Sequence, residues 1–206
     1  MKVTIIGAGN VGRALATSAR RAGHDVTVTA KNPDHATDVA GQTGARAAAS
    51  SKEASSQADV IVLAVPVTAL DEVATELSDV AAGKAVVDVT NHPVPDPSGD
   101  DTSAAESLQA KLPQAHVVKA FNTVFASHQA DPVVDGVPLD GYVAGDDERA
   151  KKTVLELVKS IGLRPIDAGP LTMARALEGL GWLNISLNMN NGWSWQTGWK
   201  LVGPTR

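Results

Sequence analysis

The stretch that decides the fold is Lys2-Val-Thr-Ile-Ile-Gly7-Ala-Gly9-Asn-Val-Gly12, where an apolar β-branched run stops at glycines and a helix-like segment begins. This order predicts a strand, a phosphate-binding loop and a helix. Gly7 would permit the tight turn, Gly9 would let the backbone approach a pyrophosphate, and Gly12 would let helix and strand pack closely. The helix is expected to continue through Arg13 to Gly23, with Gly23 as its C-cap.

The glycine loop predicts a dinucleotide site, because the phosphate charge would sit on the N-terminus of a helix, where backbone N–H groups and the helix dipole favour anions. The alternative is a glycine-rich turn in an α/β protein that binds no nucleotide. We expect the loop to contact the cofactor through Gly7, Ala8, Gly9, Asn10, Val11 and Gly12.

Length and composition limit the possible functions. A chain of 206 residues can form one domain, or a nucleotide-binding domain with a small appendage, but not two large domains. The net charge of -5 disfavours nucleic acid and anionic membranes as partners. Cysteine is absent, which excludes disulfides, thiol nucleophiles and cysteine-bound metals.

The location and metal content follow from two further patterns. The longest apolar run, Val60 to Val65, is too short to span a bilayer, and the N-terminus enters a strand directly, so we expect a soluble cytoplasmic protein. The histidines show no pairing that would aim two of them at one metal, and most are expected to be solvated; they are His24, His35, His92, His116 and His128.

The second strand, Asp25 to Ala30, bears on which cofactor is bound. NAD-specific sites usually place an acid at the end of this strand to hold the ribose hydroxyls, but here the side chains are Thr29, Lys31 and Asn32. A lysine could bind a 2′-phosphate that an acid would repel, which favours NADP. Lys31 could instead be an ordinary surface lysine, and Asp34 is the residue that could reverse the preference.

The middle of the chain alternates between helices and strands. Residues 33–57 predict a short helix, an edge strand near 45–48 and another short helix; a buried strand over 59–65, a helix over 68–77 and a strand over 84–89 follow. Val65 and Pro66 end the buried strand, at the edge where ligands of open α/β sheets lie.

The long polar loop from Thr90 to Asp101 would rim or close the site, with Asn91 at its start. His92 could donate to a substrate oxygen, although an exposed or turn-capping role is favoured because no carboxylate partner is visible. After a helix over 103–112, the strand 116–120 leads into Asn122, Thr123 and Val124. These residues could form a nicotinamide floor, or a simple turn at the edge of the core.

The C-terminal part predicts a loop over 130–140, a strand over 141–145, a helix over 148–161 capped by Asp146, and a strand over 163–166. A last helix carries Met173, Leu177, Leu180 and Leu183, before a tail with three tryptophans and several asparagines. We expect the tail to form a dimer contact or the wall of a pocket. We expect a Rossmann domain over residues 1–168 and a small helical lobe over 169–206.

Three stretches resemble the family of NADP oxidoreductases that includes NADPH-dependent reductases of the deazaflavin coenzyme F-420. They are Gly7-Ala-Gly-Asn-Val-Gly12, Val118-Lys-Ala-Phe-Asn-Thr123, and Gly162-Leu-Arg-Pro-Ile-Asp-Ala-Gly-Pro-Leu171 followed by Arg175-Ala-Leu-Glu178. The cytosolic reductase domains of six-transmembrane metalloreductases are similar at the same places. The resemblance implies an α/β, Rossmann-type doubly wound and mostly parallel sheet with a small C-terminal helical lobe.

The resemblance also implies the activity. Hydride would pass directly between NADP and coenzyme F-420 or a flavin, so no catalytic acid or base and no metal is required. By matching positions, Thr29, Lys31 and Asn32 would hold the 2′-phosphate, and Asn122, Thr123 and Val124 would pack against the nicotinamide; Ala30-Lys31-Asn32 departs from the Ser-Arg-Arg common in the family. The alternatives are an NADPH-dependent reductase of a small imine or carbonyl, and a non-catalytic NADP-sensing module.

Overall fold

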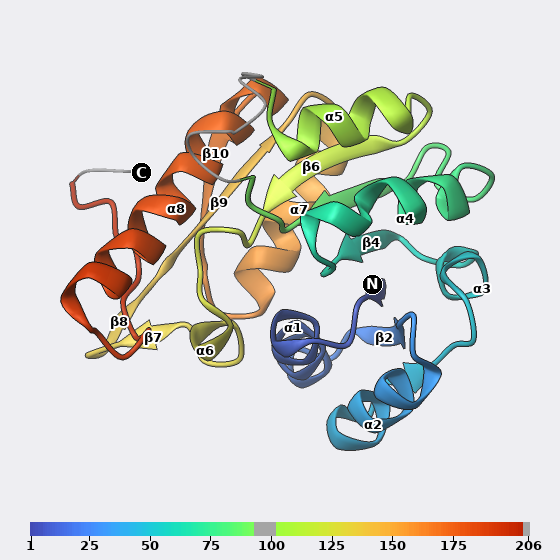
Figure 1. Ribbon diagram of the computed structural model, residues 1–206, viewed down its shortest axis with the longest axis horizontal. Helices are drawn as coiled ribbons and strands as arrows, with labels where there is room; N and C mark the ends of the chain where they lie inside the picture. Colours follow the sequence, from blue (N-terminus) through green and yellow to red (C-terminus); the bar gives the residue numbers. More distant parts are fainter. Residues whose placement is uncertain (93–101, 204–206) are drawn as a thin grey trace.

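The computed structural model describes residues 1–92 and 102–203 and contains one sheet of eight strands (Figure 1). The strands lie in the order β10-β9-β6-β5-β4-β1-β2-β3, and every neighbouring pair is parallel except β6 and β9. They are β1 (Lys2–Ile6), β2 (Asp25–Thr29), β3 (Arg46–Ala47), β4 (Val60–Leu63), β5 (Ala85–Asp88), β6 (His116–Ala120), β9 (Asp140–Gly145) and β10 (Arg164–Gly169). The expected Rossmann-type, mostly parallel sheet is confirmed.

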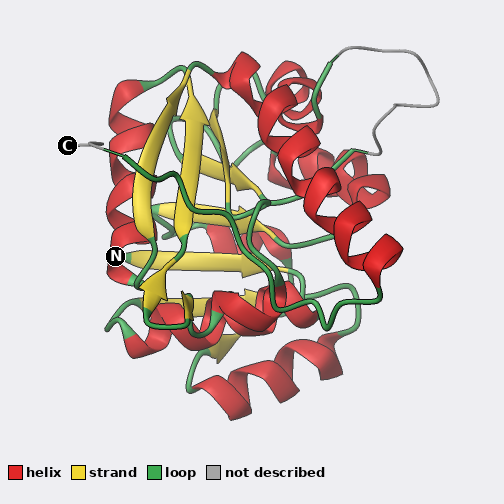
Figure 2. Ribbon diagram, turned by 90° about the vertical axis from the view of Figure 1, so that its left-hand side faces the viewer, coloured by secondary structure: helices red, strands yellow, loops and turns green. Residues whose placement is uncertain are grey.

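Helices cover both faces of the sheet (Figure 2). One face packs against α1 (Asn10–Arg21), α2 (Pro33–Thr43) and α7 (Glu148–Ser160). The other packs against α4 (Leu70–Leu77), α5 (Ala104–Lys111) and the start of α8 (Ala174–Asn191), with α3 (Ser51–Ser55) beside α4 and short 3-10 turns η1 (Val67–Ala69) and η2 (Leu171–Met173). Burial on both faces explains the continuous apolar run of β4.

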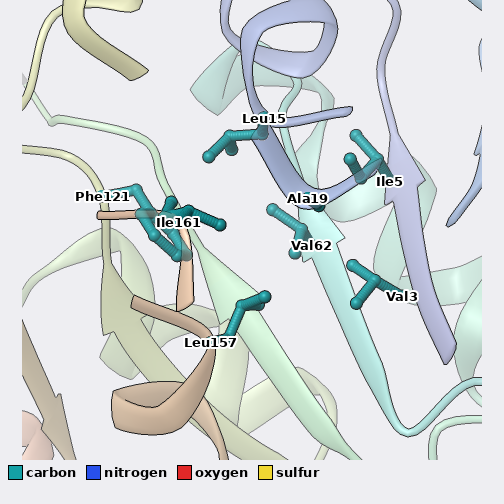
Figure 3. A pocket seen from close by; sticks show the side chains of 8 residues that line it. All are labelled: Val3, Ile5, Leu15, Ala19, Val62, Phe121, Leu157 and Ile161. Carbon is teal, nitrogen blue, oxygen red and sulfur yellow. The ribbon is translucent and has the colours of Figure 1, made fainter. Parts of the chain in front are cut away.

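The core under α1 is closely packed. Eight apolar side chains, among them Ile5 of β1, Leu15 of α1 and Phe121 after β6, surround a space of only about 10 Å³ (Figure 3). Such a space barely matches the room that one water needs, and apolar walls offer water no partners. This region is therefore core and not a ligand site.

Two local expectations were wrong. Asp147, not Asp146, caps α7, because its carboxylate accepts from the Ala150 N–H at 2.8 Å. Asp146 instead accepts from the Leu171 N–H at 2.8 Å and so joins β9 to η2. The expected loop over 130–140 contains a small antiparallel hairpin, β7 (Val133–Val134) and β8 (Val137–Pro138), and follows a short helix, α6 (Ala126–Gln129).

The tail after α8 folds back on the same chain. The Asp140 N–H donates to the Trp199 carbonyl at 3.2 Å, and the Trp199 indole N–H donates to the Leu180 carbonyl, also at 3.2 Å. Trp195 packs edge-on against Phe125, with ring centroids 5.4 Å apart. The tail therefore packs against β9, α6 and α8.

Two of the asparagines that were expected in the tail belong to the last helix and are buried. Asn184 and Asn188 lie within α8, with 4% and 1% of their surfaces exposed. Their amides bond to each other and to the Thr197 hydroxyl, which donates to Asn184 Oδ1 at 2.6 Å and accepts from Asn188 Nδ2 at 2.7 Å. The tail is thus fixed to α8 by polar side chains that leave solvent on folding.

Candidate functional site

The site lies where neighbouring strands connect in opposite directions. From β1 the chain winds to β2 and β3 on one side and to β4, β5 and β6 on the other, so the switch point falls between β1 and β4. In open α/β sheets, ligands bind at such a point beyond the carboxyl ends of the strands. The register aligns Ile6 with Leu63, Leu63 with Asp88, and Asp88 with Lys119, so the loops that follow these strands share one edge.

The glycine loop has the geometry that the sequence predicted. Gly7 has φ +117°, and a Cβ there would overlap the Ala64 carbonyl, while a Cβ on Gly12 would overlap the Gly7 carbonyl. A Cβ on Gly9 would meet no atom within 4 Å. Gly7 and Gly12 are thus required for folding, whereas Gly9 leaves space in front of the first turn of α1, where Gly9 is the N-cap.

A groove of about 1150 Å³ begins at this loop and runs between β2, α3 and α4. It has room for a nucleotide, and its walls come from both sides of the switch point. Of the predicted cofactor residues, those in its lining are Gly7, Ala8, Gly9, Thr29, Lys31, Asn32, Val65 and Pro66. Asn10, Val11 and Gly12 form the first turn of α1, directly after the loop.

The three predicted 2′-phosphate residues differ in what they offer to the groove. Lys31 is exposed, and its ammonium lies 3.0 Å from the Glu72 carboxylate of α4. Thr29 is 2% exposed. Asn32 caps α2, since its side-chain oxygen accepts from the Asp34 N–H at 3.0 Å. Lys31 is therefore the accessible cation of this trio, but it already has a partner.

The remaining predicted residues lie along the same edge, outside the lining of the groove. The amides of Asn91 and Asn122 are paired, because Asn122 Nδ2 donates to Asn91 Oδ1 at 2.8 Å and Asn91 Nδ2 donates to the Asn122 carbonyl at 3.2 Å. Asn122 Nδ2 also donates to the Leu177 carbonyl of α8 at 2.8 Å. Thr123 and Val124 follow and are buried.

Three buried oxygens at this edge have no hydrogen-bond partner within the described part of the chain: Asn122 Oδ1, Thr123 Oγ1 and Thr90 Oγ1. Buried polar groups in proteins are nearly always paired, so such atoms point to a polar ligand or water that completes them. All three can accept hydrogen bonds. Acceptors of this kind suit the NH2 group of a carboxamide, which is the part of a nicotinamide that Asn122 and Thr123 are expected to contact.

A buried charge cluster that the sequence analysis missed lies beneath this edge. The Lys119 ammonium contacts Asp88 Oδ2 at 2.8 Å, Glu178 Oε1 at 2.6 Å and the Thr90 carbonyl at 2.6 Å, and the lysine and aspartate side chains are fully buried. Glu178 also accepts from the backbone N–H groups of His92 and Ala104. The Glu178 carboxylate thus links α8 to β6, to His92 and to the start of α5.

Two of the five histidines are buried, His35 is exposed and the other two are half-buried. His24 and His128 are buried; His24 Nε2 lies 2.7 Å from the Ser160 hydroxyl, and His128 Nε2 lies 2.9 Å from the Gln196 carbonyl. Burial, followed by the N-terminal charge, lowers the pKa of His24. His92 and His116 are half-buried, and most of the predicted loop from Thr90 to Asp101 lies outside the described residues.

Within residues 1–92 and 102–203, no group of three or more histidine, aspartate or glutamate side chains could hold a metal ion. Over the same residues, no helix combines the length and apolar character needed to cross a membrane.

Several known proteins resemble this chain in sequence or in structure. A family model described as NADP oxidoreductase coenzyme F420-dependent matches residues 2–92. The F420-dependent NADP reductase of Methanothermobacter marburgensis is 30% identical over 212 residues, which cover 93% of this chain and 94% of that protein. Metalloreductase STEAP3 of Rattus norvegicus is 34% identical over 184 residues, 87% of this chain; the chain spans only 36% of that longer protein.

A solved structure from Arthrobacter sp. FB24, assigned as an F420-dependent NADP reductase, superposes with a TM-score of 0.83. It is 29% identical in sequence, and the match covers 93% of this chain and 95% of that one. The likeness therefore extends well beyond residues 2–92, which the family model matches.

Proposed function

Because the chain belongs to the family of coenzyme F420-dependent NADP oxidoreductases, we propose that it transfers a hydride directly between NADP(H) and coenzyme F-420 or a flavin. The observation that carries the proposal is the arrangement along one sheet edge. Lys31 after β2, the phosphate loop after β1 and the unpaired oxygens of Asn122 and Thr123 after β6 follow one another there, in the order 2′-phosphate, pyrophosphate and nicotinamide in which NADP presents its parts.

The residues of the chain would divide the work of binding. The backbone of the loop from Gly7 to Gly12 would hold the pyrophosphate at the N-terminus of α1. Lys31 would hold the 2′-phosphate, and the oxygens of Asn122 and Thr123 would orient the carboxamide. Bound NADPH supplies a hydride, so the protein has to provide proximity and orientation more than proton transfer.

The state of the ionisable side chains supports a reaction without a protein acid or base. Lys119 is fully buried between two carboxylates and reaches no solvent. Burial, followed by the negative charge of Asp140, raises the pKa of Tyr142 above its ordinary value and keeps the phenol protonated.

NADPH is expected to bind more tightly than NADH. Loss of one partly exposed charged contact costs about 1 to 2 kcal/mol, or roughly 5- to 30-fold in affinity. Titration of both nucleotides into the wild type and Lys31→Ala tests this, and equal affinities of the wild type for the two nucleotides would contradict it.

The acceptor is tested by following NADPH oxidation with coenzyme F-420, FMN, FAD and a panel of imines and ketones. Turnover with F-420 or a flavin is expected. Turnover confined to imines or ketones would instead favour the reductase of small substrates and direct attention to His92, Lys119 and Tyr142 as proton donors. Tight NADPH binding without any turnover would favour the sensing module.

The proposal includes the organisation of the protein. We expect a homodimer in the cytoplasm, with residues 1–168 as the nucleotide domain and 169–206 as the C-terminal lobe. The dimer is supported by apolar side chains of α8 and the tail that are still exposed after the tail has folded back. They are Leu183, Met189, Trp193 and Trp195, each between 43% and 66% exposed.

A further inference from the structure

Two ion pairs cross the groove. The Lys31 ammonium lies 3.1 and 3.0 Å from the two carboxylate oxygens of Glu72, and the Lys52 ammonium lies 2.9 Å from Asp79 Oδ2. All four side chains line the groove. Both cations stand on the side formed by the β2–α2 loop and α3, and both anions stand on the side formed by α4 and the residues directly after it.

The Glu72 carboxylate lines the groove, and NAD-specific sites place a carboxylate at the end of their second strand. In such sites an acid there accepts hydrogen bonds from the ribose hydroxyls and repels a 2′-phosphate. Here the corresponding strand ends in Thr29 and leads to Lys31, but an acid reaches the same lysine from the first turn of α4. The carboxylate is therefore present at this corner of the groove, although it comes from a different element.

We propose that Glu72 is a specificity-determining residue that reduces the preference of this chain for NADPH over NADH. The inference rests on the proposed nucleotide function of the groove. To bind a 2′-phosphate, Lys31 has to exchange its contact with Glu72 for the phosphate, and the displaced carboxylate stays nearby as a like charge. With NADH, Lys31 keeps its partner and Glu72 can accept from a ribose hydroxyl.

The size of the effect follows from exposure. The Lys31 side chain is 86% exposed and that of Glu72 is 56% exposed, so the pair is screened by water and easily broken. Exposed ion pairs contribute at most about 1 kcal/mol, which corresponds to about fivefold in a dissociation constant. Glu72 therefore adjusts the preference without preventing NADPH from binding.

The test is the substitution Glu72→Gln, with Glu76→Gln as the matched control. Glu76 lies one helical turn further along α4 and lines the same groove, so the control loses the same charge from the same wall. Dissociation constants for NADPH and NADH are measured by calorimetric titration at low salt. Both residues are on the surface of α4, and thermal unfolding verifies that both variants are folded.

We expect Glu72→Gln to tighten NADPH binding about fivefold and to leave NADH binding unchanged or weaker, while Glu76→Gln changes both by less than twofold. In the double variant Lys31→Ala/Glu72→Gln, the gain should disappear, because the competition acts through the lysine. If the wild type binds NADPH and Glu72→Gln leaves its affinity unchanged, or if Glu76→Gln gives the same gain, the inference is wrong. If the wild type binds neither nucleotide, the proposed function itself is refuted and the inference falls with it.

Discussion

Removing the buried cation, by the substitution Lys119→Met, should be the most damaging single change in the charge cluster. The ammonium lies between Asp88 and Glu178, whose side chains are 0% and 3% exposed. Methionine has a similar length but no charge, so both carboxylates would stay buried without a counter-ion. Like charges in a site of low polarity repel strongly, and neither can reach water without moving α8.

The expected loss of stability is about 3 to 5 kcal/mol, the range for breaking a buried ion pair from one side. In a chain of this length, about 1 kcal/mol shifts the melting temperature by 2 to 4 °C, so Tm should fall by about 10 °C. Glu178→Gln should cost only about 1 to 2 kcal/mol. It leaves one cation facing one anion, its amide oxygen can still accept from the Lys119 ammonium and the Ala104 N–H, and only the contact with the His92 N–H is lost.

Urea unfolding and thermal melting of the two variants test this order. The matched control is Lys52→Met, which makes the same substitution in an ion pair whose partners are 60% and 73% exposed and should leave the stability nearly unchanged. A Lys119→Met variant as stable as Glu178→Gln, or as the Lys52→Met control, would refute the argument from buried charge.

Three further outcomes are expected. Gly9→Ala should keep its melting temperature but lose nucleotide affinity, whereas Gly12→Ala should be destabilised, because only at Gly12 would the new methyl overlap backbone; equal melting temperatures would contradict this. In sedimentation, the full chain should be a dimer and a chain ending at Asn191 a monomer; a monomeric full chain would argue against the proposed interface. The hydrogen bond from Arg175 lowers the pKa of Glu106 from 4.5 to about 2. The stabilisation that this pair contributes should therefore be fully present above about pH 4.5 and lost as the pH falls towards 2. If the free energy of unfolding of the wild type and of Arg175→Met changes identically with pH over this window, the pair has no such role.

The nucleotide half of the fold could be predicted from sequence because its signals are local. The strand before Gly7, the turn and the helix after it are adjacent in the chain, and the structure confirms the steric reasons for Gly7 and Gly12. The buried strand Val60–Leu63 could also be predicted from the sequence, because an apolar run of this length suits a strand covered on both faces.

The features that were missed depend on contacts far apart in the chain. Lys119 meets Asp88 across 31 residues and Glu178 across 59, and Lys31 meets Glu72 across 41. One signal was present: the runs Ala85-Val-Val-Asp88 and His116-Val-Val-Lys119 place opposite charges at the same step of neighbouring strands, and the observed register pairs them. That signal is readable only once the strand order is known.

The choice between neighbouring aspartates shows the same limit on a smaller scale. Either Asp146 or Asp147 could cap α7 by composition, since both precede the helix. Asp147 does so because Asp146 is engaged by the Leu171 N–H, a contact that no local pattern encodes.

The composition of α8 has a consequence for the order in which the molecule opens. The helix contains Gly179, Gly181 and four asparagines, residues that disfavour an isolated helix, by about 1 kcal/mol for each glycine relative to alanine. A side chain at Gly181 would nevertheless displace Asn91, since a Cβ there would lie 2.6 Å from Asn91 Oδ1. The helix therefore owes its persistence to docking on α5, on the Asn91–Asn122 edge and on the tail. Its amides should exchange with deuterium through local opening, at a lower free energy than those of β1 and β4, so the Asn91–Asn122 edge should come apart while the glycine loop is still folded.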